Sequence, residues 1–225
     1  MANKALSIVS TITQEIMAVN QIPGGAAVGH VFSAFQKRRE TQARDILMKR
    51  IAEAEIDIAE AAEKDEMIGV IYAYMQAASK GAARANLDLL SQAIAGEMKR
   101  DQIYPDKFLK YVNILSTLTR DEIFIIGAYV RCRRAVLKEA EGKNEVFLRG
   151  IYQNTWNRFV AELVPKSFET DEHVKVILGG LVRTGLVKAA STTIDEIGVP
   201  SFTILLDEIA PLIDFDKAYR EFPSY

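Results

Sequence analysis

The chain of 225 residues is poor in cysteine and histidine and carries almost no excess of charge of either sign. Cys132 is the only cysteine, so neither a disulfide framework nor a four-cysteine metal site can form within one chain. A single unpaired cysteine also fits a reducing compartment, and we expect a cytoplasmic protein. The net charge of −2 excludes a general positive field that would hold nucleic acid, although a local basic face remains compatible with it.

Long apolar runs are missing as well. No stretch reaches the roughly 18 uninterrupted apolar residues expected of a membrane-spanning helix, and Gln14 and Glu15 interrupt the apolar N-terminus, which does not read as a signal peptide. We therefore expect no stable membrane span. One membrane alternative stays open, because Gly25, Gly29 and Ser33 have the small-residue spacing that lets helices pack closely in lipid. The same spacing is equally explained by close packing in a soluble bundle.

The sequence also lacks recognisable catalytic motifs. His30 and His173 are the only histidines, and neither has a carboxylate or second histidine at the spacing of a helical metal site. There is no Gly-x-Ser-x-Gly nucleophile turn and no phosphate-binding loop with its lysine and hydroxyl. Arginines flank Cys132 and could lower its thiol pKa, but a half-buried structural cysteine is the simpler interpretation. We predict no catalytic residue, no cofactor and no metal site.

Helical periodicity is what the sequence does contain. Apolar residues recur at spacings of three and four over residues 6–19, residues 26 to about 62, and residues 65–99. Gly81 and Gly96 each weaken a helix by about 1 kcal/mol relative to alanine, so a break is expected near one of them. The predicted buried stripe of the third segment contains Ile68, Ile71, Tyr72, Met75, Ala78 and Ala82.

A sharp corner between two further helices is specified by its end residues. Pro105 suits the first turn of a helix, and the predicted core face of that helix holds Phe108, Leu109, Val112 and Leu115. Thr119 then acts as the N-cap of the next helix, and Glu122 completes a capping box three residues later.

The C-terminal part changes character. Thr170 or Asp171 can cap a helix that ends near Gly185, after which the short apolar runs 186–193 and 200–205 predict a β-hairpin. A last helix over 206–221 follows. Helix, hairpin and helix in this order close a winged-helix module. We therefore predict a mainly α protein, a multi-helix bundle with a C-terminal winged-helix-like unit, divided into regions 1–100 and 101–225.

Charge is segregated along the second helix, where basic residues come first and acidic residues follow. Such a helix can pair antiparallel with a copy of itself, and solvated intrahelical ion pairs are the simpler alternative. The residues predicted for self-association are Lys37, Arg38, Arg44, Glu53, Asp57 and Glu60.

DNA contact is the alternative function that the winged-helix prediction raises. Its candidate residues are Lys175, Arg183, Lys188, Arg131 and Arg134. Glu169, Asp171 and Glu172 oppose it, because they occupy the helix N-terminus where base contacts usually occur.

Three segments in this order resemble the abortive-infection alpha-type proteins, a group of bacterial helical proteins. The first runs from Pro105 to Glu122 and the second from Leu181 to Val187, whereas the third, residues 202–207, lacks the glycine often seen before the last helix. The resemblance covers the chain from about residue 65 onward and implies an origin near phage-defence and prophage genes, with no activity to carry over. Our leading hypothesis is a non-enzymatic interaction or regulatory protein, with a DNA-binding regulator and a membrane-acting effector as alternatives.

Overall fold

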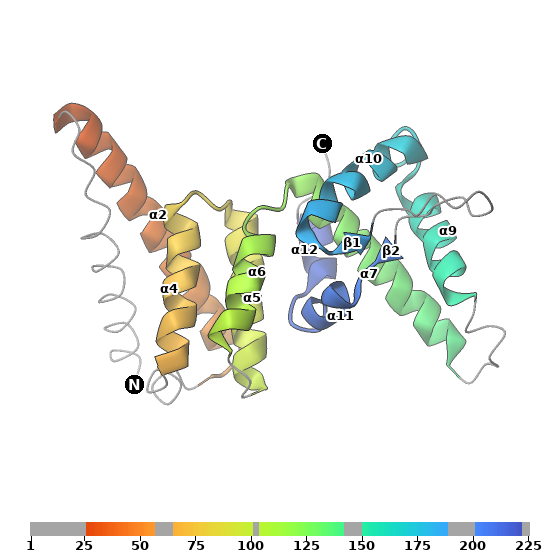
Figure 1. The fold of residues 1–225 in the computed structure, drawn as a ribbon, viewed down its shortest axis with the longest axis horizontal. Coiled ribbons are helices and arrows are strands. Elements are labelled where there is room, and N and C mark those ends of the chain that lie inside the picture. Colours follow the sequence, from red (N-terminus) through yellow and green to blue (C-terminus); the bar gives the residue numbers. More distant parts are fainter. Residues whose placement is uncertain (1–25, 57–64, 101–103, 142–149, 189–200, 222–225) are drawn as a thin grey trace. The chain divides into compact units, whose positions relative to one another are not determined.

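The computed structural model describes residues 26–56, 65–100, 104–141, 150–188 and 201–221. Within these residues the protein is mainly helical, with one small antiparallel sheet near the C-terminus, which confirms the predicted fold class (Figure 1). The chain divides into two compact units, unit 1 over Met1–Thr117 and unit 2 over Leu118–Tyr225. This division differs from the predicted boundary at residue 100, because the helix that begins at Pro105 packs on the helices before it. The predicted helix 6–19 lies outside the described residues.

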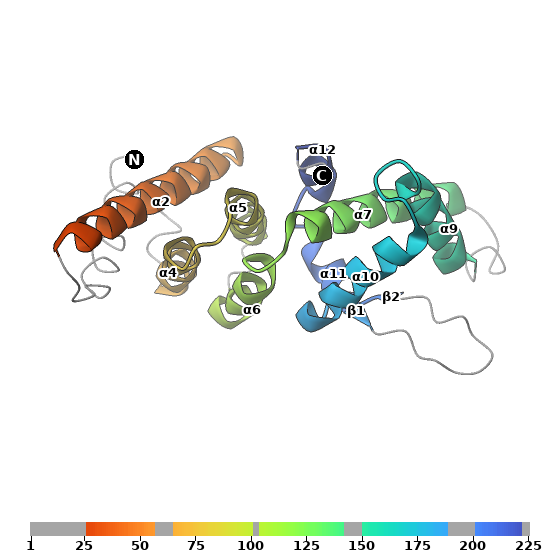
Figure 2. The same ribbon diagram turned by 90° about the horizontal axis from the view of Figure 1, so that it is seen from above.

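Unit 1 consists of α2 (Ala26–Glu53), α4 (Asp65–Ser79), α5 (Arg84–Lys99) and α6 (Pro105–Leu115). The helix α2 packs on α4 and α5, and α6 packs on the same two helices. Figure 2 shows α4 and α5 nearly end-on, with α2 lying across them. The expected break between α4 and α5 falls at Gly81, whose φ of 104° is one that residues with a side chain rarely adopt.

The core of unit 1 is apolar with a few internal hydrogen bonds between helices. The fully buried Tyr74 donates its hydroxyl to the carbonyl of Ala43 at 2.9 Å, and Asn86 donates to the carbonyl of Leu115 at 2.5 Å. These bonds tie α4 to α2 and α5 to the end of α6. Because buried polar groups are costly unless they are paired, each bond also specifies which faces meet.

Two predicted core faces in unit 1 are confirmed in part, because Ile71 and Met75 of α4 and Phe108 of α6 are buried as predicted. Ile68 and Tyr72 of α4 are both 40% exposed, and Leu109 of α6 is 47% exposed. Their places are taken by Met67, Val70, Tyr74, Tyr111 and Ile114, which are buried. A helix that contacts several neighbours buries a wide face, and apolar spacing alone does not give its centre.

Unit 2 is built around α7 (Arg120–Ala140), which packs against α9 (Ile151–Leu163), α10 (Asp171–Leu181) and α12 (Phe215–Glu221). A short 3₁₀ turn, η1 (Val182–Thr184), follows α10 and ends at Gly185. Strand β1 (Val187–Lys188) pairs antiparallel with β2 (Ser201–Phe202), so that Val187 lies opposite Phe202. The predicted last helix is two helices in the structure, α11 (Ile204–Ile209) and α12, separated by the turn that contains Pro211.

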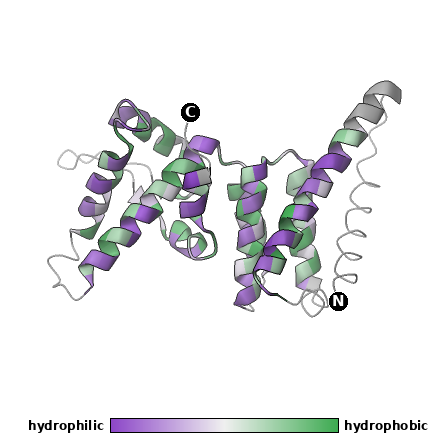
Figure 3. Ribbon diagram, turned by 180° about the vertical axis from the view of Figure 1, so that it is seen from behind, coloured by the Kyte–Doolittle hydropathy of each residue, from purple (hydrophilic) through white to green (hydrophobic). Residues whose placement is uncertain are grey.

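Aromatic rings fill the contacts of α7. Tyr129 meets Phe159 of α9 edge-on at 5.8 Å and stacks on Phe202 of β2 at 3.8 Å between ring centroids. Phe124 stacks on Tyr219 of α12 at 4.5 Å. The α12 backbone reaches α7 at Gly127, where an added Cβ would lie 2.6 Å from the Phe215 carbonyl oxygen. Hydrophobic and hydrophilic residues alternate along the helices of each unit, as expected when one face of each helix enters a core (Figure 3).

Candidate functional site

The corner before α7 is the most tightly specified feature of unit 2. Thr119 and Glu122 form the predicted capping box: the Glu122 amide donates to Thr119 Oγ1 at 3.2 Å, and the Thr119 amide donates to Glu122 Oε2 at 2.8 Å. The Glu122 side chain is only 5% exposed. A carboxylate so deeply placed requires a counter-charge in addition to the backbone amide.

Arg183 supplies this counter-charge from η1. It forms an ion pair with Glu122 through Nη1, donates through Nη2 to Glu122 Oε2 at 2.9 Å, and donates to the Gly180 carbonyl at 2.6 Å. Burial acts to raise the pKa of Glu122, but the hydrogen bonds from Arg183 and Thr119 together hold that pKa below its usual range. Gly180 leaves room for the pair, since a Cβ there would lie 3.1 Å from Glu122 Oε1. Arg183, predicted as a DNA contact, therefore joins η1 to the start of α7.

The basic cluster on α7 is similarly engaged. Arg131 pairs with Glu162 of α9 and its guanidinium lies 4.3 Å from the ring centroid of Tyr219. Arg133 pairs with Asp207 of α11. Arg134 is exposed, and no ion pair of this residue occurs within the described part of the chain. Of the two predicted α7 contacts, only Arg134 is thus presented to a ligand.

Cys132 lies in the same cluster and is 1% exposed. Its thiol donates to Glu162 Oε2 at 3.2 Å. Burial raises the pKa of the thiol and outweighs the opposing effect of Arg131 and Arg158. A buried, protonated thiol is a poor nucleophile, so the interpretation as a structural cysteine is supported by its surroundings.

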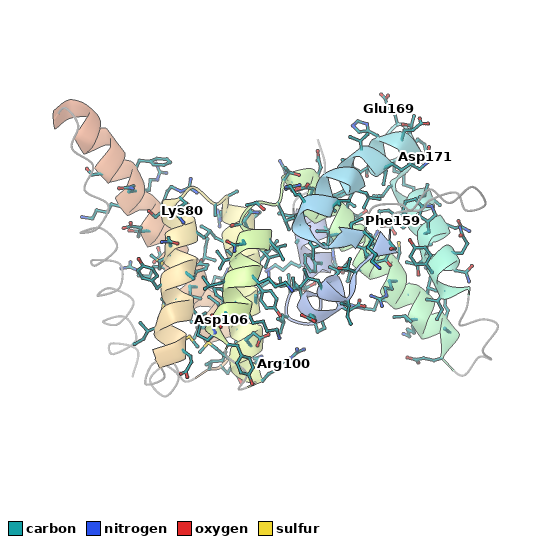
Figure 4. All side chains as sticks on the ribbon, viewed as in Figure 1. Lys80, Arg100, Asp106, Phe159, Glu169 and Asp171 are labelled. Carbon is teal, nitrogen blue, oxygen red and sulfur yellow. The ribbon has the colours of Figure 1, made fainter. Side chains whose placement is uncertain are left out.

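The outward side of α10, where a winged helix would meet DNA, is neutral to acidic. Lys175 pairs with Asp171 at 2.8 Å, whereas Glu169 and Glu172 are exposed. Figure 4 shows Glu169 and Asp171 at the N-terminal end of α10, pointing away from the rest of unit 2. Lys188 is exposed on β1 and is the remaining predicted DNA contact.

An apolar side chain occupies the middle of this side of α10. Val176 is 72% exposed, and Gly179, one turn further, has open space where a Cβ would lie. We call the surface formed by Glu172, Val176 and Gly179 the α10 face. His173 is exposed next to it and donates its backbone amide to the Thr170 side chain.

Unit 1 contains a different surface. Lys37, Arg38, Asp45, Ile46 and Lys49 of α2 line an open cleft of about 760 Å³, which Arg84 of α5 also borders. We call it the α2 cleft.

The residues predicted for self-association fall into three groups. Lys37 and Arg38 line the cleft, and each is exposed. Arg44 lies 3.4 Å from Asp45, and Glu53 accepts from Arg50 at 2.8 Å. Asp57 and Glu60 lie outside the described residues. The predicted extension of α2 towards residue 62 is wrong, because the helix ends at Glu53 and Glu55 has a positive φ of 55°.

No cluster of three or more histidine, cysteine or acidic side chains that could hold a metal ion occurs in the described ranges. The side chain of His30 lies outside them. None of the helices in the described segments combines the length and apolar character that crossing a membrane requires.

The acidic partners of Arg131 and Arg133 on α7 were not predicted from the sequence. Glu162 and Asp207 were not singled out, and Asp207 lies 74 residues from its partner Arg133. Arg84 was missed as a cleft residue, although one signal was available. A cation as the first residue of a helix opposes the helix dipole and marks an arginine that is not placed for helix stability.

Comparison with known proteins adds no assignment, because no family model, no curated protein and no solved structure matches this chain. The proposed function therefore depends on the placement of the charged and apolar side chains.

Proposed function

We propose that the chain is a non-enzymatic helical interaction protein, which contacts a protein partner through the α10 face of unit 2. The observation that carries this proposal is the pairing of the predicted DNA-contact cations. Arg183 neutralises Glu122, Arg131 pairs with Glu162, and Lys175 pairs with Asp171. What remains outward on α10 is an exposed valine beside an exposed glycine, with acidic residues at one end. A neutral to acidic surface of this kind disfavours a polyphosphate, which binds through available cations.

The resemblance to the abortive-infection alpha-type proteins extends this proposal to a bacterial or prophage protein with a role in phage defence. We place it in the cytoplasm, where its unpaired cysteine stays reduced.

The proposal is tested by capture of partners from the native host with full-length chains, quantified by mass spectrometry. Val176→Asp should abolish capture of the specific partners. Ile204→Asp is the matched control, because Ile204 is 76% exposed and lies on α11, outside the α10 face. Equal capture by the wild type and by Val176→Asp would exclude the α10 face as the contact surface.

A DNA-binding regulator is the second candidate, and the order of elements in unit 2 favours it. Three packed helices, α7, α9 and α10, precede the hairpin β1–β2, as in a winged-helix module. Arg183→Glu is a poor test, because it would place a second acid against buried Glu122 and disturb the fold. Lys188→Glu and Arg134→Glu change exposed side chains and separate DNA contact from folding.

A further inference from the structure

The α2 cleft carries cations that the fold does not use. Lys37, Arg38 and Arg84 are exposed, and none of them makes an ion pair within the described residues. Other arginines of the same helix are engaged: Arg39 donates to the carbonyls of Ala78 and Ala82, and Arg50 binds Asp88 at 2.8 Å. The helix thus separates structural cations on its inner side from available cations in the cleft.

Arg84 lies at a position where a cation is unfavourable for the stability of its own helix. It is the first residue of α5, the N-cap residue Ala83 offers no side-chain cap, and the first turn contains no acidic residue. A cation at such a terminus meets the positive end of the helix dipole. Local stability does not account for this arginine, whereas an anionic ligand in the cleft does.

The distribution of charge in the cleft selects the kind of anion. Lys37 and Lys49 stand twelve residues apart on α2, which is about 18 Å along a helix. Asp45 lies between them with its side chain 65% exposed. A phosphate backbone places a charge at about every 3.4 Å of strand and would meet this carboxylate. A peptide helix, in contrast, can carry acidic side chains only at the positions that face the cations of the cleft, and apolar side chains at the positions that contact Ile46.

A second copy of this chain does not fit the cleft well. Antiparallel self-pairing requires one straight helix that continues from a basic into an acidic half, but α2 ends at Glu53. Glu53 also forms ion pairs with Arg50 at 2.8 Å and with Lys49 at 3.7 Å. The first acid of the predicted acidic half is therefore already neutralised within its own chain.

We propose that the α2 cleft binds an acidic amphipathic helix of a partner protein. Acidic side chains of that helix contact Lys37, Arg38 and Arg84, and its apolar residues cover Ile46. This site lies in unit 1 and is independent of the α10 face, so either surface can fail without the other.

The probe is a fluorescein-labelled peptide of glutamate, leucine and alanine, about 16 residues or about 24 Å long as a helix, with its glutamates on one side. A scrambled peptide of equal composition and a DNA duplex of equal charge serve as comparisons. The full-length chain is titrated into each and binding is followed by anisotropy, with circular dichroism to verify that every variant is folded.

The double variant Lys37→Glu/Arg38→Glu should raise the Kd of the amphipathic peptide at least about tenfold, which corresponds to about 1.4 kcal/mol. The matched control, Lys110→Glu/Lys166→Glu, makes the same charge change at two exposed lysines outside the cleft and should leave the Kd within about twofold. Absence of peptide binding, equal weakening by the control, equal binding of the scrambled peptide, or tighter binding of the duplex would each overturn the proposal.

Discussion

The ion pair between Glu122 and Arg183 joins α10 and η1 to the start of α7, and the effects of the two side chains on the stability of unit 2 should be coupled. A hydrogen bond to a charged group contributes about 1.5–3 kcal/mol, and the 46% exposure of the Arg183 side chain reduces its pair with Glu122 to about 1–2 kcal/mol. Loss of the capping interaction adds about 1 kcal/mol. We expect Glu122→Ala to lower the free energy of unfolding of unit 2 by about 2–3 kcal/mol, and Arg183→Ala by about 1–2 kcal/mol.

Trp156 makes this measurement specific. It is the only tryptophan of the chain and is buried in α9, so its fluorescence during urea unfolding reports unit 2. Following one unit in this way avoids treating a chain of two compact units as a single two-state system. The double variant should cost about as much as Glu122→Ala alone, which gives a coupling energy of about 1–2 kcal/mol. Additive effects, within about 0.5 kcal/mol, would show that Glu122 and Arg183 are not coupled in the folded protein.

The same carboxylate predicts a pH dependence with a defined sign. The pKa of Glu122 is lowered in the folded protein, so the unfolded chain binds the proton more readily. The stability that Glu122 contributes is therefore present above its unfolded pKa of about 4.3 and is lost as the pH falls through the lowered folded value. The difference in stability between wild type and Glu122→Gln should shrink over this acidic range. A difference that stays constant with pH would contradict this origin.

Four further substitutions test single residues. Gly127→Ala should destabilise unit 2 by about 2 kcal/mol in the Trp156 assay, because the new methyl group would clash with the backbone of α12. Gly179→Ala should instead stabilise unit 2 by about 0.5–1 kcal/mol, because the space around Gly179 is open and alanine favours a helix. Burial raises the pKa of Glu40, and its Oε2 has no hydrogen-bond partner among the described residues. Glu40→Gln should therefore stabilise unit 1 by about 1 kcal/mol at neutral pH, as measured by hydrogen exchange of α2. This gain in stability should vanish below about pH 4. Arg84→Glu should raise the stability of unit 1 by about 0.3–1 kcal/mol in calorimetry, while it weakens anion binding in the cleft.

The outcomes that would contradict these predictions are specific. Equal effects of the two glycine substitutions would remove the argument from close approach. A loss of stability in Glu40→Gln would show that its carboxylate has a partner. A loss of stability in Arg84→Glu would show that the arginine serves the fold.

Local signals in the sequence predicted local structure well. The capping box of Thr119 and Glu122, the helix start at Pro105 and the break at Gly81 depend on residues within a few positions, and the structure confirms each of them. The short hairpin near the C-terminus is confirmed for the same reason, since its two apolar runs lie close together in the chain.

Features that depend on distant residues could not be predicted in this way. The buried face of α4 is set by where α2, α5 and α6 lie, so Ile68 turned outward although its spacing indicated the core. Arg183 read as an available cation because its partner Glu122 is 61 residues away. Charge counted along the sequence does not reveal which cations are already paired in the fold.

We propose that unit 2 contacts protein, and three of its five predicted DNA-binding cations are paired within the fold. The most direct test is the anisotropy of a labelled duplex titrated with the full-length chain at physiological salt. We predict a Kd in the non-specific range of about 10⁻⁴–10⁻⁶ M that Lys188→Glu changes by less than about twofold. A Kd of about 10⁻⁸ M or tighter, lost in Lys188→Glu, would show instead that unit 2 binds DNA specifically.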